Sequence, residues 1–295
     1  MIDYHGHMAP VQDLTDACAR GFMPFPRHWP TALTDVEANL AEMASAKISV
    51  RYLSVPPILY GYELPLHEQA ALVARLNNWM VETAVAPAFL PTCILPLGDA
   101  DASIAEIARM RAAGVRSAAI GSHVMGQPLD RIVPDGVWSA MAEAFDFILL
   151  HPWQVRGSDM LAEYGLTNPI GNPVETTVAG SRLIASGVLT RHPDLQILLA
   201  HGGGCLPYLA GRMRRAWEMS PKGPEPAETM RRFYFDTVVF EPQQLRHLVD
   251  VVGADRVLLG TDSPFGMAVS APGALAEAAG WCPHGLPAKE KAIAE

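Results

Sequence analysis

Short apolar runs alternate with longer helix-like stretches along this chain of 295 residues. Most runs are rich in leucine or β-branched residues and are bounded by polar or glycine-containing segments, which is typical of buried strands in a parallel sheet. The predicted strands are Ile2–Tyr4, Ser49–Val55, Ala88–Leu97, Arg116–Ile120, Phe147–Leu150, Gln196–Ala200, Arg232–Asp236 and Val257–Gly260. The predicted helices between and after them are Asp35–Ala46, His67–Ala84, Ala102–Ala113, Pro134–Ala144, Val174–Ser186, Leu206–Met219, Pro242–Val252 and Pro272–Ala279. Eight units of strand then helix indicate an α/β fold of the (β/α)8 TIM-barrel type.

The main alternative fold is a doubly wound open sheet, but no glycine-rich phosphate loop follows the first predicted strand. No linker, low-complexity tract or charge block divides the chain, so we expect one domain over residues 1–295. The stretch from Ala9 to Pro30 is long for a barrel loop and contains several aromatic residues and prolines. We expect residues 9–30 to form an irregular, lid-like insertion over the barrel mouth. Asp35 is the expected N-cap of the helix that follows.

Several histidines and one aspartate directly follow predicted strands, at the end of a barrel where catalytic residues gather. They are His5, His7, His151, His201 and Asp262. His5 and His7 are two residues apart, so in a strand their side chains would point to the same face. Each residue also has a structural interpretation of its own, such as capping a helix or bonding a loop carbonyl. Their common position after strands favours a shared site.

Three imidazoles and one carboxylate suit a divalent transition metal and leave one coordination position open for water. Barrels that hold two metal ions often bridge them with a carbamylated lysine at strand four. No lysine occurs between Lys47 and Lys222, so that bridge is absent and we expect one metal ion. Zn²⁺ is the first expectation, with Mn²⁺ or Co²⁺ as alternatives for the same ligand set.

Composition narrows the possible partners and the compartment. The net charge is −9 and only four lysines occur, none in a cluster, which argues against a nucleic-acid-binding surface. The four cysteines form no Cys-x-x-Cys pair, so a thiolate zinc site or a disulfide scaffold is not expected. No apolar run is long enough to span a bilayer, and no signal peptide is recognisable at the start of the sequence. We therefore expect a cytoplasmic protein with a small-molecule substrate.

The motifs around these residues resemble those of the amidohydrolase superfamily, in its "amidohydrolase 2" branch. The motifs are Ile-Asp-Tyr-His5-Gly-His7, Leu-Leu-His151-Pro-Trp, Leu-Ala-His201-Gly-Gly-Gly-Cys and Leu-Leu-Gly-Thr-Asp262-Ser-Pro-Phe. Within that branch the chain is most similar to decarboxylases of the 2-amino-3-carboxymuconate-6-semialdehyde decarboxylase type, which are metal-dependent and non-oxidative. The resemblance extends from Met1 to about Gly280.

This resemblance implies a role for each candidate residue. The metal ligands would be His5, His7, His151 and Asp262. His201 would be the catalytic acid/base beside a metal-bound water. Arg27 and Arg212 would hold substrate carboxylates, and Arg212 would do so in the site of a partner subunit, which implies a homodimer. On the residues alone, Arg212 could equally form an ordinary ion pair on a helix surface. Trp153 borders the site and is a candidate substrate-binding residue.

The predicted reaction is decarboxylation of a small unsaturated or aromatic carboxylic acid. Imidazole titrates near neutrality and can both accept and return a proton, as this reaction requires. The alternative within enzymes is hydrolysis of a lactone, an amide or a C–C bond, because one barrel can support both chemistries. A non-catalytic, metal-stabilised barrel is a third possibility, which predicts a closed ligand shell. The loop after Trp153 differs from that of the relatives, so the sequence leaves the substrate open.

Overall fold

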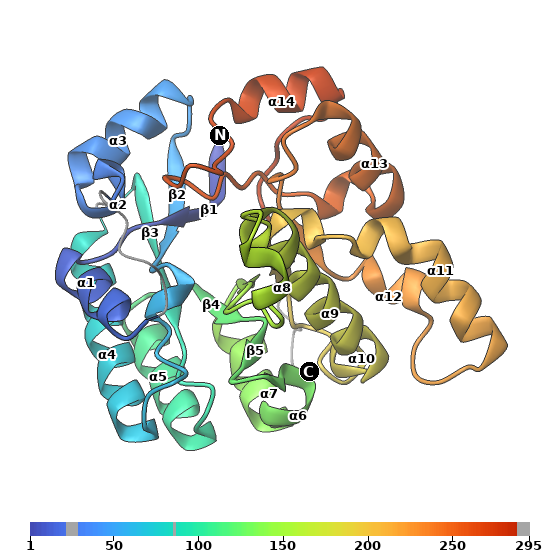
Figure 1. Ribbon diagram of the computed structural model, residues 1–295, viewed down its shortest axis with the longest axis horizontal. Coiled ribbons are helices and arrows are strands. Elements are labelled where there is room, and N and C mark those ends of the chain that lie inside the picture. Colours follow the sequence, from blue (N-terminus) through green and yellow to red (C-terminus); the bar gives the residue numbers. More distant parts are fainter. Residues whose placement is uncertain (22–28, 85–86, 288–295) are drawn as a thin grey trace, which may run out of the picture.

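Seven parallel strands form the central sheet of the protein (Figure 1). The structure is a computed structural model that describes residues 1–21, 29–84 and 87–287. In the order of the sheet, the strands are β1 (Ile2–His7), β2 (Val50–Ser54), β3 (Phe89–Ile94), β4 (Ser117–Gly121), β7 (Phe147–His151), β8 (Ile197–Leu199) and β9 (Tyr234–Phe235). Every residue of β4 and β7 is buried, as expected for strands covered on both faces.

An eighth, irregular segment closes the sheet into a barrel. Val257–Gly260 was predicted as a regular strand, but within it the structure has only an isolated bridge from Phe235 to Val257, and a second bridge from Gly6 to Ser263 follows it. Hydrogen bonds complete the closure, with Leu258 N donating to Phe235 O (2.9 Å) and Tyr4 N donating to Leu259 O (2.9 Å). The TIM-barrel prediction is confirmed and the open-sheet alternative is wrong, because the last segment joins β9 to β1.

Helices cover the outside of this barrel and follow the strands in turn (Figure 1). The longer ones are α3 (Val36–Ser45), α4 (Leu66–Thr83), α5 (Ala100–Ala112), α7 (Asp135–Ala144), α9 (Asn172–Ala185), α11 (Leu206–Met219), α13 (Pro242–Val252) and α14 (Pro272–Ala279). The bounds of the last three agree with the prediction, since proline lies in the first turn of each, where its missing N–H costs nothing. Asp35 caps α3 as expected, and its carboxylate accepts from Ala38 N (2.8 Å).

The connections carry short elements that sequence periodicity did not predict. They are α1 (Val11–Ala19), α2 (Thr31–Thr34), η1 (Pro57–Leu59), β5 (His123–Val124), β6 (Gln127–Pro128), α6 (Leu129–Ile132), α8 (Asp159–Ala162), η2 (Thr167–Gly171), α10 (Val188–Arg191), η3 (His201–Gly203), α12 (Pro226–Met230) and η4 (Ala254–Arg256). The stretch expected to be irregular after Ala9 is thus helical over α1, which an ion pair between Asp13 and Arg75 (2.6 Å) ties to α4. The lid role of residues 9–30 stays a prediction, and part of that stretch lies outside the described residues.

None of the helices in the described ranges is both long enough and apolar enough to cross a membrane.

Candidate metal centre

Three histidines and one aspartate meet at the carboxyl-terminal end of the barrel. His5 and His7 lie on β1, and His151 is the last residue of β7. Asp262 lies on the irregular closing segment, and its backbone N–H donates to the carbonyl oxygen of His5 (2.8 Å). One possible ligand atom from each of the four residues lies within 4.8 Å of the others, and all four residues are buried. The barrel thus brings together residues that are as many as 257 positions apart in the sequence.

The imidazole nitrogens that face one another in this group are all Nε2 atoms. His5 Nε2 and His7 Nε2 are 3.1 Å apart, and Asp262 Oδ1 lies 3.1 Å from His7 Nε2 and 3.4 Å from His5 Nε2. The Nε2 of His151 is 3.9 Å from the same oxygen and has no hydrogen-bond partner in the described part of the chain, although it is buried. Such an unpaired buried nitrogen, close to a carboxylate and to two other ring nitrogens, fits a site for a cation.

The opposite ring nitrogen of each histidine has a partner that fixes the orientation of the ring. His5 Nδ1 donates to Asp236 Oδ2 (2.7 Å), and His151 Nδ1 donates to the carbonyl oxygen of Pro152 (2.9 Å). His7 Nδ1 lies 3.2 Å from the hydroxyl of Ser54. A proton on Nδ1 leaves the Nε2 lone pair free, which is the arrangement that metal-binding histidines use. The four residues therefore fit one divalent metal ion as a set of three neutral nitrogens and one carboxylate oxygen.

Burial and the neighbouring charges set the protonation of this group. Burial lowers the pKa of His7, and it lowers the pKa of His151 to about 3. Burial opposes ionisation of Asp262, but the charge of His5 and the interactions with the other neighbouring histidines hold its pKa well below the usual range. The pKa of His5 is raised, because the Asp262 and Asp236 carboxylates outweigh the effect of burial. An ionised Asp262 beside neutral His7 and His151 is the state that binds a cation.

His201 lies beside the four-residue group, on the glycine-rich turn after β8. Its Nε2 is 3.4 Å from Asp262 Oδ2, and its ring centroid is 5.1 Å from that of His151. The Nδ1 atom is buried and has no hydrogen-bond partner within the described ranges. Both His201 and Asp262 have positive φ values, 57° and 59°, in a region that non-glycine residues seldom occupy outside functional sites. The surrounding turn holds this conformation, because the Gly202 N–H donates to Asp236 Oδ1 (2.7 Å).

A buried arginine explains the glycine between the two histidines of β1. A Cβ atom at Gly6 would lie 2.5 Å from Cδ of Arg51, which passes directly over this position. Arg51 is fully buried and its Nε donates to Asp3 Oδ2 (2.8 Å). The Asp3 carboxylate also accepts from the backbone of His5 and from both Thr261 N and Thr261 Oγ1. This network ties β1 and β2 to Thr261, the residue before Asp262, and so supports the backbone of two candidate ligands, His5 and Asp262.

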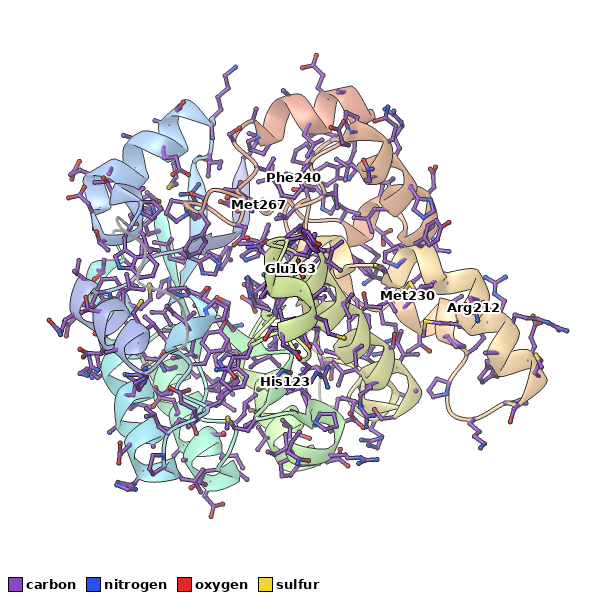
Figure 2. The ribbon with its side chains drawn as sticks, viewed as in Figure 1. His123, Glu163, Arg212, Met230, Phe240 and Met267 are labelled. Carbon is purple, nitrogen blue, oxygen red and sulfur yellow. The ribbon has the colours of Figure 1, made fainter. Side chains whose placement is uncertain are left out.

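The predicted substrate-binding residues are not all near this centre. Trp153 is buried two residues after His151, and its ring lies 5.2 Å from that of Tyr62. Arg212 is exposed on α11, away from the strands (Figure 2), and no ion pair is found for it in the described part of the chain. Within the described residues, Arg212 thus makes no ion pair with the four-residue group. Arg27 lies outside the described residues. Arg156, in the loop after Trp153, is held by Glu175 (2.8 Å).

Sequence reasoning missed the residues that support the centre. Asp236 directly follows β9 and is fully buried, where it binds both His5 and the turn that carries His201. Its pKa is lowered, because interaction with His5 outweighs the effect of burial. The position at the end of a predicted strand was a signal that could have found it, as was the two-residue spacing of Asp3 before His5. No sequence signal pointed to Arg51.

A parallel barrel with this group of histidines and an aspartate at the ends of its strands is the arrangement of a metal-dependent barrel enzyme. The family model described as amidohydrolase (Amidohydro_2) matches residues 2–292, and the chain belongs to this family.

Several relatives of the chain are decarboxylases. The chain is 29% identical over 252 residues to 2-amino-3-carboxymuconate-6-semialdehyde decarboxylase of Dictyostelium discoideum, covering 82% of this chain and 70% of the relative. A crystal structure of 2,6-dihydroxybenzoate decarboxylase in complex with 2,6-dihydroxybenzoate superposes with a TM-score of 0.78 at 25% identity, over 95% of this chain and 91% of that one. A 5-carboxyvanillate decarboxylase from Novosphingobium aromaticivorans, solved with bound manganese, gives a TM-score of 0.82 at 23% identity and covers 94% and 89% of the two chains.

Proposed function

We propose that this protein is a metal-dependent, non-oxidative decarboxylase of a small aromatic or unsaturated carboxylic acid. The observation that carries the proposal is the buried group of three imidazoles and one carboxylate. A further histidine, His201, lies beside this group and is not one of its four candidate ligands. The names of the relatives support decarboxylation over hydrolysis. Their printed substrates make hydroxybenzoic acids and 2-amino-3-carboxymuconate-6-semialdehyde the first compounds to test.

His5, His7, His151 and Asp262 are proposed to hold one divalent metal ion. Zn²⁺ is the first choice for a tetrahedral nitrogen-rich set, and Mn²⁺ or Co²⁺ are alternatives, with manganese present in a structure of similar fold. When bound, the ion would act as a Lewis acid that polarises a substrate oxygen.

His201 is proposed as the proton donor in the reaction. The bond between the substrate carbon and its carboxylate breaks, the electron pair stays on the carbon, and CO2 leaves. The carbon then takes up one proton, which the His201 imidazole supplies. Asp262 Oδ2, 3.4 Å from Nε2 of His201, orients the ring, and the Asp236 bond to Gly202 holds the turn in place. Trp153 is proposed to form part of the wall against which the substrate packs.

The first experiment is a CO2-release assay on the metal-loaded protein, with a chelated sample as control. The acids are 2-amino-3-carboxymuconate-6-semialdehyde, made enzymatically, and a set of hydroxybenzoates. We expect metal-dependent CO2 release that His201→Asn reduces by about 10²-fold or more, the usual contribution of a general acid. His67→Asn is the matched control, because the side chain of His67 is 84% exposed on α4. A protein that retains one metal ion but releases no CO2 from any of these acids would refute decarboxylation and favour hydrolysis.

Arg212 is proposed to bind the substrate carboxylate in the site of a second copy of the chain, so that the functional unit is a homodimer. Its exposed position on α11, away from the strands, supports this arrangement (Figure 2). The test mixes two inactive variants, Arg212→Ala and His201→Asn. In a mixed dimer the Arg212→Ala subunit keeps its own His201 and receives Arg212 from its partner, so one site in two should recover. If mixing restores no activity although mixed dimers form, Arg212 does not act across the interface. Arg27 is proposed as the second carboxylate-binding residue, on the resemblance alone.

A cytoplasmic location is proposed as well. All four cysteines are free, and Cys205 and Cys282 are exposed, which suits a reducing compartment.

A further inference from the structure

The hydroxyl of Tyr60 is buried without a hydrogen-bond partner among the described residues. Tyr60 directly follows the short helix η1 in the connection after β2, and its backbone is held on both sides. Its N–H donates to Pro57 O (3.0 Å), and its carbonyl accepts from Gln69 Nε2 (3.5 Å). The position of the residue is therefore fixed, while its one polar side-chain atom is left unpaired. An unpaired buried hydroxyl is costly, and native structures seldom contain one without a reason.

The ring of Tyr60 belongs to an aromatic wall beside the metal centre. Its centroid lies 5.7 Å from that of Tyr62, which lies 5.2 Å from that of Trp153. Burial, the neighbouring Tyr62 and the charge of Asp262 together hold the pKa of Tyr60 well above its usual value. The hydroxyl therefore stays protonated, as a neutral donor. The wall meets the metal centre through Tyr62, which binds Gly121 N at the end of β4, where Gly121 pairs with His151.

Two comparisons indicate what the free hydroxyl is for. Tyr62, in the same wall, has a structural bond, because its hydroxyl oxygen accepts from Gly121 N (3.0 Å). Two of the other unpaired buried atoms, Nε2 of His151 and Nδ1 of His201, belong to the metal centre itself. The unpaired hydroxyl of this wall thus accompanies two unpaired ring nitrogens of the metal centre, as expected where a polar ligand completes the hydrogen bonding.

We propose that Tyr60 is a substrate-binding residue whose hydroxyl donates a hydrogen bond to an anionic oxygen of the bound acid. This inference rests on the proposed function and adds a specificity-determining contact to it. Because the donor is buried, an analogue that lacks the matching oxygen leaves the hydroxyl unpaired and is rejected more strongly than lost contact area alone would predict. The residue contributes to the choice of acid and to its orientation, and it takes no part in holding the metal.

The test compares Tyr60→Phe with Tyr62→Phe in three measurements. The first is the melting temperature of the protein without metal or acid. The second is the Kd of 2,6-dihydroxybenzoate and of benzoate for the metal-loaded protein, by calorimetry. The third is kcat and KM for whichever acid the wild type decarboxylates. Each variant removes one hydroxyl and keeps the ring, so packing is preserved in both.

We expect Tyr60→Phe to melt at the wild-type temperature or above, because it removes an unpaired polar atom. Tyr62→Phe should melt lower, since Gly121 N loses its partner. Tyr60→Phe should weaken binding of 2,6-dihydroxybenzoate about tenfold or more and raise KM, the size expected for a hydrogen bond to a charged oxygen. The relative loss on benzoate identifies whether the carboxylate or a ring oxygen is the acceptor.

Three results would overturn the inference. If Tyr60→Phe lowers the melting temperature as much as Tyr62→Phe does, its hydroxyl has a structural partner such as a buried water. If Tyr60→Phe binds both acids as the wild type does, while the wild type releases CO2, only the role of Tyr60 fails and the decarboxylase proposal stands. If the wild type keeps one metal ion but neither binds nor decarboxylates any acid, the proposed function fails together with this inference.

Discussion

Replacing Asp236 by asparagine should weaken metal binding at the centre, although none of the four candidate ligands is changed. In the wild type, Asp236 Oδ2 accepts from His5 Nδ1 (2.7 Å), while Oδ1 accepts from Gly202 N (2.7 Å) and Val238 N (3.1 Å). All three partners are donors, so both carboxylate oxygens are needed as acceptors. An amide offers only one oxygen, and the two backbone N–H groups cannot reverse their polarity. The amide NH2 of the variant must therefore face His5 Nδ1.

This change has a defined consequence for His5. Facing an NH2 group, the imidazole is most stable with its proton on Nε2 and its lone pair on Nδ1. The Nε2 atom, which lies 3.1 Å from His7 Nε2 and 3.4 Å from Asp262 Oδ1, then carries a proton where a metal ion requires a lone pair. Loss of such a supporting partner weakens metal binding by about 10–100-fold, or roughly 1.4–2.7 kcal/mol. Loss of a hydrogen bond to a buried charged group adds about 1.5–3 kcal/mol of lost stability.

The assay is a competition titration of Zn²⁺ between the protein and a chromophoric chelator, with urea unfolding measured in parallel. Asp130→Asn is the matched control, because Asp130 is also largely buried and forms a two-point pair with Arg182 (2.7 and 2.8 Å), away from the centre. It should lose stability and keep its metal affinity. Wild-type zinc affinity in Asp236→Asn would refute the reasoning, because it would mean that the tautomer of His5 does not depend on Asp236.

Three other changes test the packing beside the centre, the buried His123 and the metal ligands. Gly6→Ala should lower the free energy of unfolding by about 1–3 kcal/mol in urea titrations, because the added Cβ would displace Arg51. Gly136→Ala is the control, since a Cβ at Gly136 meets open space and should cause no such loss. Equal effects of the two substitutions would contradict this account. Burial lowers the pKa of His123; the charge of Arg156 adds to this effect, and the charge of Glu175 opposes it. The unfolded chain therefore binds the proton more readily than the folded protein does, and the free energy of unfolding should fall as pH drops below about 6.5. His123→Gln should make that fall shallower between pH 7 and 5. Parallel curves of unfolding free energy against pH for the wild type and the variant would argue against this role of His123. Free Zn²⁺ at 100 times its Kd should raise the stability of the wild type by about 2.7 kcal/mol, measured as a shift in melting temperature. A similar shift in Asp262→Asn would exclude Asp262 as a ligand.

Local sequence patterns were sufficient for most of the fold. The bounds of α11, α13 and α14 agree with the prediction, because prolines in the first turn are signals that reside in a few neighbouring residues. Val257–Gly260 has strand-like composition but only an isolated bridge in the structure, because its partners on β9 and β1 and the turn at Asp262 decide its conformation. The helix α1 was missed, since the aromatic and proline-rich stretch after it dominated the pattern.

The sequence by itself determined which residue types stand at the ends of the strands, because alternating apolar runs define those ends and the histidines follow them directly. It could place His5 and His7 on one face, since that depends only on the two-residue period of a strand. Only the tertiary structure decided what lies around them. Asp236 and Arg51 act through contacts between segments far apart in the chain, and the position of Arg212 away from the strands depends on the packing of α11. Such contacts leave no local period in a sequence, because they are set by how the closed barrel brings the ends of its strands together.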